Sequence, residues 1–429
     1  MPRTPSKPIP TELQTPPQWL RWAPLVILAL HLGLAVLYNW ATPFGNNGYA
    51  NTPDEGAHFQ YVEYVAKEWR LPVFEGYEGV GYEAHQPPLY YFLSAVVYHL
   101  TGGSGKGVRL LSTLCSLGVV ALVYLTMRRL FPERPLLALG AMAFTAFLPM
   151  HIAIGSAVGN DALTNLLFAG ALYLVAVLLA EPPQIRTLLF LGAVVGLALL
   201  TKATAVLLFP ISVVALSLSA LRGSAGWSGA LRASGLVVGI ALAIGGWWFV
   251  RNALLYNDPL LQRTFVEVFA GTARAQNFLE AGMSFGEYLR LVADWTFRSF
   301  WFAYGTPRTA NTGLPNFLPS SVYLGLLGWQ ILVLVGLVLR WRAGFSQSQR
   351  DWLWVSLLTL GLVALTFGLF IRVFFQAQGR YFYPALLPIA VFNALGWEGL
   401  IPPKWHRTAF IGLMLFWFAL ALGCWRYLG

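Results

Sequence analysis

Apolar segments close to the length of a membrane-spanning helix follow one another along most of this chain, and they restrict its fold more than any other feature. A helix crosses the hydrocarbon core of a bilayer with about 20 apolar residues. Hydrophobic residues make up 57% of the 429 residues and charged residues only 11%, which is more apolar than a soluble domain. The sequence therefore predicts an all-α, polytopic membrane protein.

The net charge of +10 does not indicate a nucleic-acid partner. The basic residues occur in small groups between the apolar segments, where they orient the helices by remaining on the cytoplasmic side of the membrane. We therefore exclude nucleic-acid binding. The two cysteines, Cys115 and Cys424, lie inside apolar segments and lack the spacing of a metal site or a disulfide framework.

The N-terminus is predicted to be cytoplasmic, because three basic residues precede the first apolar segment, 24–40, and positive residues stay inside. These are Arg3, Lys7 and Arg21. Residues 1–18 contain several prolines and no apolar pattern, so we expect a disordered cytoplasmic tail.

The apolar run 89–100 has two possible placements. If it spans the membrane, the later basic clusters, beginning with Arg128 and Arg129, fall on the outer side. If it lies in the interface, as its short length allows, the same arginines are cytoplasmic. We adopt the second placement, which brings every later cluster to the inside.

This placement predicts about eleven transmembrane helices, each near the length that a bilayer requires. The predicted spans are 24–40, 108–127, 136–152, 162–180, 187–200, 203–221, 236–250, 322–339, 352–371, 385–400 and 409–424. We expect residues 19–429 to form a single transmembrane domain with two long outer loops. These loops are 41–107, which would contain interfacial helices, and 251–319.

The first outer loop contains Thr52-Pro53-Asp54-Glu55, which has the form of a helix start. Thr52 would be the N-cap, Pro53 the first helical residue and Glu55, three residues after the cap, the acid of a capping box. Capping accounts for Glu55 but leaves Asp54 free. Ionisable groups among apolar walls at a membrane face are often functional, so we expect Asp54 to be catalytic, with Glu55 as a further catalytic candidate.

Two histidines of the same loop are candidate metal ligands. His58 lies one turn after Asp54, and His85 precedes Gln86-Pro87-Pro88. Together with Asp54 and Asp161 they would offer the oxygen and nitrogen ligands that suit a divalent cation. The alternative is that both histidines only make hydrogen bonds within the fold.

The predicted topology delivers further polar residues to the outer face, each with a structural alternative. Asp161 could be catalytic or part of a helix cap. Lys202 could neutralise a lipid phosphate or extend to the interface. Arg251 follows two tryptophans and could instead be an interfacial anchor. Arg380, followed by Tyr381, suits bidentate phosphate binding.

Several short motifs occur in order over most of the chain. They are Pro53-Asp54-Glu55, His85-Gln86-Pro87-Pro88-Leu89-Tyr90-Tyr91, Gly159-Asn160-Asp161-Ala162, Leu200-Thr201-Lys202, Trp248-Phe249-Val250-Arg251-Asn252 and Gly379-Arg380-Tyr381-Phe382-Tyr383-Pro384. As a set they resemble the GT-C superfamily of integral-membrane glycosyltransferases. The resemblance is greatest to protein O-mannosyltransferases, to the lipid A aminoarabinose transferase and to an uncharacterised bacterial branch.

The resemblance implies a polyprenyl-phosphate-linked sugar donor and a site that faces outward. Asp54 and Asp161 match the two acidic positions. His85 matches the place where the aminoarabinose branch has a metal-binding glutamate, and Lys202 and Arg380 match basic positions on the donor side. Gln86 departs from the lysine of that branch.

We therefore predict an inverting glycosyltransferase of a bacterial plasma membrane, with Asp54 as the base and an unknown glycan, lipid or protein acceptor. The predicted catalytic residues are Asp54, Glu55 and Asp161. The predicted phosphate-binding residues are Lys202, Arg251, Arg380 and Tyr381. The alternative function is transport of a polyprenyl phosphate or a lipid-linked sugar by a flippase, although transporters more often place ionisable residues within their spans.

Overall fold

The computed structural model describes residues 18–45, 52–305 and 314–428, and no β-strand occurs among them. The prediction of an all-α membrane protein is confirmed. The predicted disordered tail, 1–18, lies outside the described residues except for its last residue.

The chain forms seventeen α-helices and four 3-10 helices within the described residues. In order they are α1 (Trp19–Ala41), α2 (Glu55–Glu68), η1 (Tyr82–His85), α3 (Leu89–Leu100), α4 (Gly105–Leu130), α5 (Pro135–Ala146), α6 (Pro149–Gly155), α7 (Asp161–Ala180), α8 (Ile185–Leu199), η2 (Ala203–Leu207), α9 (Leu208–Arg222), α10 (Gly226–Tyr256), α11 (Gln262–Val268), α12 (Ala275–Glu280), α13 (Phe285–Trp301), α14 (Ser320–Arg342), α15 (Gln347–Ile371), η3 (Gly379–Ala385), α16 (Leu386–Leu400), η4 (Pro403–Trp405) and α17 (His406–Trp425).

Eight helices in the described part of the chain are long and apolar enough to cross a membrane, and the bent pair α5 and α6 would add a ninth. The eight are α1, α4, α7, η2 with α9, α10, α14, α15, and η4 with α17. The remaining two predicted spans correspond to α8 and α16, which have 15 residues each. That is shorter than the usual membrane span, so the number eleven stays a prediction.

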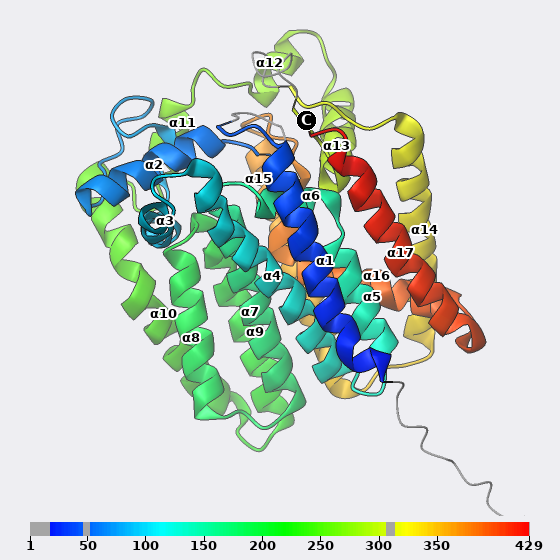
Figure 1. The fold of residues 1–429 in the computed structure, drawn as a ribbon. Coiled ribbons are helices and arrows are strands. Elements are labelled where there is room, and N and C mark those ends of the chain that lie inside the picture. Colours follow the sequence, from blue (N-terminus) through cyan, green and yellow to red (C-terminus); the bar gives the residue numbers. More distant parts are fainter. Residues whose placement is uncertain (1–17, 46–51, 306–313, 429) are drawn as a thin grey trace, which may run out of the picture.

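The described part of the loop 41–107, which we predict to be the first outer loop, lies across one end of the bundle. Figure 1 shows α3 almost end-on beside α2, whereas α8 and α10 run along the bundle. The helix α3 corresponds to the apolar run that we placed in the interface, and its 12 residues are too few to span a bilayer. Its placement in the interface stays a prediction.

The pair α14 and α16 is packed almost backbone to backbone. A Cβ atom added to Gly336 would lie 1.8 Å from the carbonyl oxygen of Gly396, and one added to Gly399 would lie 2.0 Å from that of Gly336. Small residues permit this approach in membrane helices, where van der Waals packing drives association. This contact fixes α16, which follows directly after η3.

The helices α5 and α6 are separated by a bend of 61°. At the break, Nδ1 of His31 lies 2.6 Å from the carbonyl oxygen of Ala146, and Nδ1 of His151 lies 2.9 Å from that of Thr145. The hydroxyl of Ser116 lies between the two imidazoles, 2.9 Å from His31 Nε2 and 3.3 Å from His151 Nε2. All three side chains are buried, so the two carbonyl groups at the break find their hydrogen-bond partners within the fold.

Candidate active site

Asp54 immediately precedes α2 and has a left-handed backbone, with φ of 61°. The expected N-cap at Thr52 is wrong, because α2 begins at Glu55 and its cap position is Asp54, which makes no side-chain cap bond. Aspartate is one of the few residues other than glycine that tolerates this region. A sparsely populated backbone conformation at a charged residue is typical of functional sites.

Glu55 points away from Asp54 into a fully buried ion pair with Arg109. The guanidinium donates from Nε to Glu55 Oε1 at 2.7 Å and from Nη2 to Oε2 at 2.6 Å. The backbone N–H of Val158 also donates to Glu55 Oε1, at 2.9 Å. Both carboxylate oxygens are therefore occupied, and a structural role replaces the capping box that we expected. The catalytic assignment of Glu55 stays a prediction.

Arg380 bridges two of the predicted catalytic residues, Asp54 and Asp161. It lies on η3, and its guanidinium donates from Nη1 to Asp161 Oδ2 at 2.7 Å and from Nη2 to Asp54 Oδ2 at 3.0 Å. Its Nε donates to Gln378 Oε1 at 2.7 Å. Although burial alone would lower the pKa of Arg380, the charges of Asp161 and Asp54 raise it, so the guanidinium stays ionised.

Lys202 completes the cluster from another part of the chain. It lies between α8 and η2, and its ammonium group pairs with Asp161 Oδ1. The ring of Tyr381 lies beside both cations, 5.3 Å from the Arg380 guanidinium carbon and 6.0 Å from Lys202 Nζ. Asp161 thus holds two cations together at the first residue of α7. Five of the predicted residues converge here, namely Asp54, Asp161, Lys202, Arg380 and Tyr381.

Asp54 is the acid that is most open to solvent. Its side chain is 27% exposed, against 14% for Asp161 and 7% for Arg380. The hydroxyl of Tyr82 donates to Asp54 Oδ1 at 3.1 Å. Burial and the neighbouring charge of Asp54 raise the pKa of Tyr82, so it remains a donor.

Arg251 does not contact this cluster. Its Nη2 donates to the carbonyl oxygen of Pro72 at 2.6 Å, and its guanidinium lies 5.1 Å from the centre of the Trp248 ring. These contacts tie α10 to the first outer loop. They favour the anchoring role over the phosphate-binding role that we also considered, which stays a prediction.

The four predicted metal ligands do not form a metal site. Within the described residues, no group of three or more histidine, cysteine, aspartate or glutamate side chains could hold a metal ion. His58 has its Nδ1 at 2.8 Å from the Tyr91 hydroxyl. His85 has its Nδ1 at 2.6 Å from the Tyr82 carbonyl oxygen and its Nε2 at 3.1 Å from the Gln86 side-chain amide. These nitrogens make hydrogen bonds within the fold, as in the alternative interpretation.

The ring of His85 is also enclosed by aromatic side chains, with centroids 5.3 Å from Phe74 and 5.3 Å from Phe265. Burial lowers its pKa to about 4, while the Tyr82 carbonyl partly opposes the shift. As the pH falls, His85 therefore binds a proton near pH 6.5 in the unfolded chain but only near pH 4 in the folded chain. The free energy of unfolding must decrease as the pH falls through this interval.

We expect the variant His85→Asn to lose part of this dependence. The free energy of unfolding of the wild type should decrease by roughly 1–2 kcal/mol more than that of the variant between pH 6.5 and 4.5, after allowance for partial exposure. Unfolding in detergent at a series of pH values measures the difference. Equal slopes would show that His85 titrates normally.

Glu83 lies in the cluster, although the sequence interpretation passed over it. It is 7% exposed, and its Oε2 has no hydrogen-bond partner among the described residues. His58 Nδ1 lies 3.8 Å from Oε2, beyond hydrogen-bond distance. Burial raises the pKa of Glu83. The negative charge of Asp54 raises it further, and the positive charge of Lys202 lowers it. The only feature of the sequence that could have indicated Glu83 as a site residue is its position two residues before His85.

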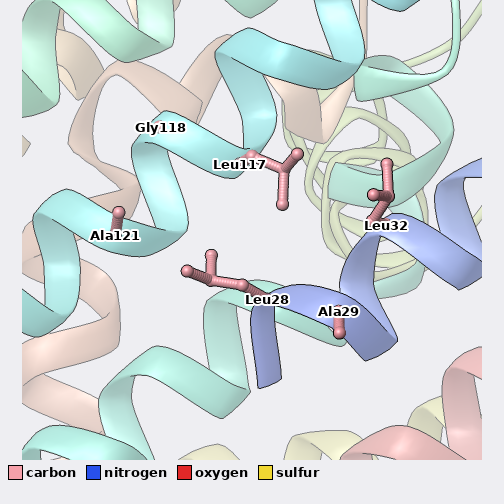
Figure 2. A pocket seen from close by; sticks show the side chains of 6 residues that line it. All are labelled: Leu28, Ala29, Leu32, Leu117, Gly118 and Ala121. Carbon is pink, nitrogen blue, oxygen red and sulfur yellow. The ribbon is translucent and has the colours of Figure 1, made fainter. Parts of the chain in front are cut away.

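An apolar groove lies elsewhere, between α1 and α4. It has a volume of about 410 Å³ and is lined by Leu28, Ala29, Leu32, Leu117, Gly118 and Ala121. Figure 2 shows only hydrocarbon side chains around it. Both helices are candidate membrane spans. The groove offers no group for acid–base or phosphate chemistry, so the polar cluster is the candidate active site.

Comparisons with known proteins agree with the architecture around this cluster. Residues 85–247 match the family model of dolichyl-phosphate-mannose-protein mannosyltransferases, which is less than half of the chain. The oligosaccharyltransferase of Archaeoglobus fulgidus, in complex with Zn and sulfate, superposes with a TM-score of 0.59 at 16% identity over 95% of this chain and 53% of that one. The chain has the GT-C fold.

Two further GT-C structures are similar. Oligosaccharyltransferase AglB from Archaeoglobus fulgidus, in complex with an inhibitory peptide and a dolichol-phosphate, has a TM-score of 0.56 at 13% identity, covering 96% of this chain and 56% of that one. ArnT from Cupriavidus metallidurans has a TM-score of 0.43 at 17% identity, covering 87% and 76%. The chain thus spans about half the length of the oligosaccharyltransferases. No curated protein sequence matches it.

Proposed function

We propose that this GT-C chain transfers a sugar from a polyprenyl-phosphate-linked donor to an acceptor hydroxyl at the outer membrane face, with inversion. The observation that carries the proposal is the cluster in which Arg380 joins Asp54 to Asp161 while Lys202 pairs with Asp161. It places two cations beside an exposed carboxylate at one end of an apolar bundle. We further propose that the membrane is a bacterial plasma membrane and that the N-terminus is cytoplasmic.

Arg380 and Lys202 are suited to hold the donor phosphate. A guanidinium offers paired N–H donors to phosphate oxygens, and an ammonium group adds a compact positive charge. As the bond between the sugar and the phosphate breaks, negative charge grows on the phosphate, and fixed cations stabilise it most in a partly buried site. Asp161 keeps both cations in position.

Asp54 is suited to act on the acceptor. Its carboxylate is the most exposed acid of the cluster, so it can accept the proton of an incoming hydroxyl as that oxygen bonds to the sugar. Attack from the Asp54 side while phosphate leaves on the side of the cations gives inversion. The hydrogen bond from Tyr82 orients the carboxylate for this role.

The divalent metal stays a prediction, and we route none of these steps through it. One structural relative contains Zn, but the side chains here are not arranged to hold a metal, and the guanidinium of Arg380 bridges the two carboxylates. Transfer measured with excess chelator tests this separately. Transfer that stops in chelator and returns with added divalent metal would restore the metal prediction.

The experiment that tests the donor site measures binding of undecaprenyl phosphate to the purified protein. We expect Lys202→Gln to weaken binding by roughly 10–100-fold, because it removes a charge-assisted contact worth about 1.5–3 kcal/mol. The matched control is Arg290→Gln, which removes an exposed cation from α13. Equal weakening by both variants would show a nonspecific charge effect and contradict the assignment.

Formation of product separates transfer from transport. The wild type is incubated with a panel of undecaprenyl phosphate sugars and a membrane acceptor fraction. Movement of sugar onto an acceptor supports the proposal. Movement of the intact lipid across a vesicle membrane, without release of sugar, would favour the flippase.

A further inference from the structure

Glu83 is a buried carboxylate that lacks a partner. It belongs to η1, between Tyr82, which donates to Asp54, and His85, and it is 7% exposed. Its side chain interacts with that of Gln86, but Oε2 has no hydrogen-bond partner among the described residues. A buried polar atom left unpaired costs about 1–3 kcal/mol, so an unpaired atom in a native fold calls for an explanation.

The surroundings of Glu83 show where a partner would come from. Its neighbours in the chain contact the cluster: the Tyr82 hydroxyl donates to Asp54 Oδ1 at 3.1 Å, and Gln86 Oε1 accepts at 3.0 Å from the amide of Asn160, the residue before Asp161. His58 Nδ1, at 3.8 Å, is too distant for a hydrogen bond and is instead 2.8 Å from the Tyr91 hydroxyl. The protein groups nearby are thus engaged elsewhere, and a bound ligand can supply the contact.

When Glu83 is ionised, Oε2 can only accept, so the missing partner of the carboxylate is a hydrogen-bond donor. Phosphate is an anion with acceptor oxygens, and a second carboxylate near Asp54 would repel it. A sugar hydroxyl, by contrast, donates readily to a carboxylate oxygen. The side chain of Glu83 is 9% exposed and that of Asp54 is 27% exposed, so Glu83 is the more enclosed of the two acids, which suits a contact with a bound donor rather than with an acceptor that arrives from solvent.

We propose that Glu83 is a specificity-determining residue that accepts a hydrogen bond from a hydroxyl of the donor sugar through Oε2. The inference rests on the proposed function, because it requires a sugar phosphate at Lys202 and Arg380. It goes beyond that function in naming the residue that distinguishes a sugar-bearing lipid from the bare lipid phosphate, and one sugar from another.

The test compares two ligands in two proteins. Binding constants of undecaprenyl phosphate, and of undecaprenyl phosphate carrying mannose, glucose or N-acetylglucosamine, are measured for the wild type and Glu83→Met. Methionine keeps the length of the side chain and removes both oxygens. We expect the best sugar-bearing lipid to bind the wild type roughly 10-fold or more tighter than the bare lipid, and this preference to disappear in the variant.

Two further measurements keep the result specific. Donors that lack single hydroxyls should bind the wild type more weakly at one position, and Glu83→Met should not distinguish them from the complete donor. The control Glu78→Met, at an exposed acid of the same loop, should keep the preference. Because the variant removes an unpaired buried atom, its thermal stability should equal or exceed that of the wild type; if it does not fold, Glu83→Gln, which keeps one oxygen but not the charge, takes its place.

The outcomes separate the two proposals. An unchanged preference for the sugar-bearing lipid in the Glu83 variant overturns the inference alone, and so does a wild type that binds bare and sugar-bearing lipids equally. A wild type that binds no polyprenyl phosphate overturns the proposed function and, with it, the inference.

Discussion

Replacing Asp54 with asparagine is expected to reduce sugar transfer by about 10²–10⁴-fold, the usual contribution of a general base. Asparagine tolerates the left-handed backbone at this position, where φ is 61°, and its side-chain oxygen can still accept from Arg380 or Tyr82. The variant should therefore fold and bind donor normally. Single-turnover transfer, with donor in the binding assay and a thermal unfolding curve, measures the three properties.

The matched control for this variant is Glu75→Gln, which neutralises an exposed acid of the same outer loop. It should transfer sugar at the rate of the wild type. Near-normal transfer by Asp54→Asn would remove the base from the mechanism. Loss of donor binding together with transfer would instead place Asp54 in the donor site.

Replacing Arg109 with methionine is expected to have the largest effect on stability. Besides the paired bonds to Glu55, its Nη1 donates to the carbonyl oxygens of Asn39 at 3.0 Å and Thr42 at 3.1 Å. The variant leaves the Glu55 carboxylate buried without its counter-ion, which costs about 3–5 kcal/mol. The loss of these bonds should separate the end of α1 from α2 and α4. Unfolding in detergent measures the change.

The control is Arg129→Met, which breaks a partly exposed ion pair with Glu181 and should cost less than about 1 kcal/mol. Glu55→Gln then tests the catalytic prediction for Glu55. A large loss of stability would confirm a structural role. Normal stability with loss of transfer would support the catalytic role, since Glu55 would then be dispensable for the fold.

Much of the site could be predicted because it depends on topology. Asp161, Lys202 and Arg380 are far from Asp54 in sequence, but the placement of one short apolar run in the interface brought all four to the same face. The positive-inside rule acts on whole segments, so it survives errors of several residues at each helix end. This is why the convergence was predicted although the number of spans was not confirmed.

The local contacts could not be predicted in the same way. Thr52 was the expected cap because its spacing to Glu55 fits a capping box, but Arg109, 54 residues further on, offers Glu55 two charge-assisted bonds that outweigh a cap. The sequence predicted His58 and His85 as metal ligands, but in the structure Nδ1 of His58 makes a hydrogen bond with the Tyr91 hydroxyl and Nδ1 of His85 makes one with the Tyr82 carbonyl oxygen. Tertiary packing decides which of several possible partners a side chain bonds, and the spacing of residues in the sequence carries no information on that packing.

The bend between α5 and α6 shows that a buried histidine in a membrane protein can have a purely structural role. A chain that changes direction inside the bundle leaves carbonyl groups where no solvent can reach them. Here the imidazoles of His31 and His151, bridged by Ser116, take the place that water would fill in a soluble protein. These side chains supply hydrogen-bond partners that stay in place, so the route of the chain toward Asp161 depends on two residues of other helices, His31 and Ser116, as well as on its own His151.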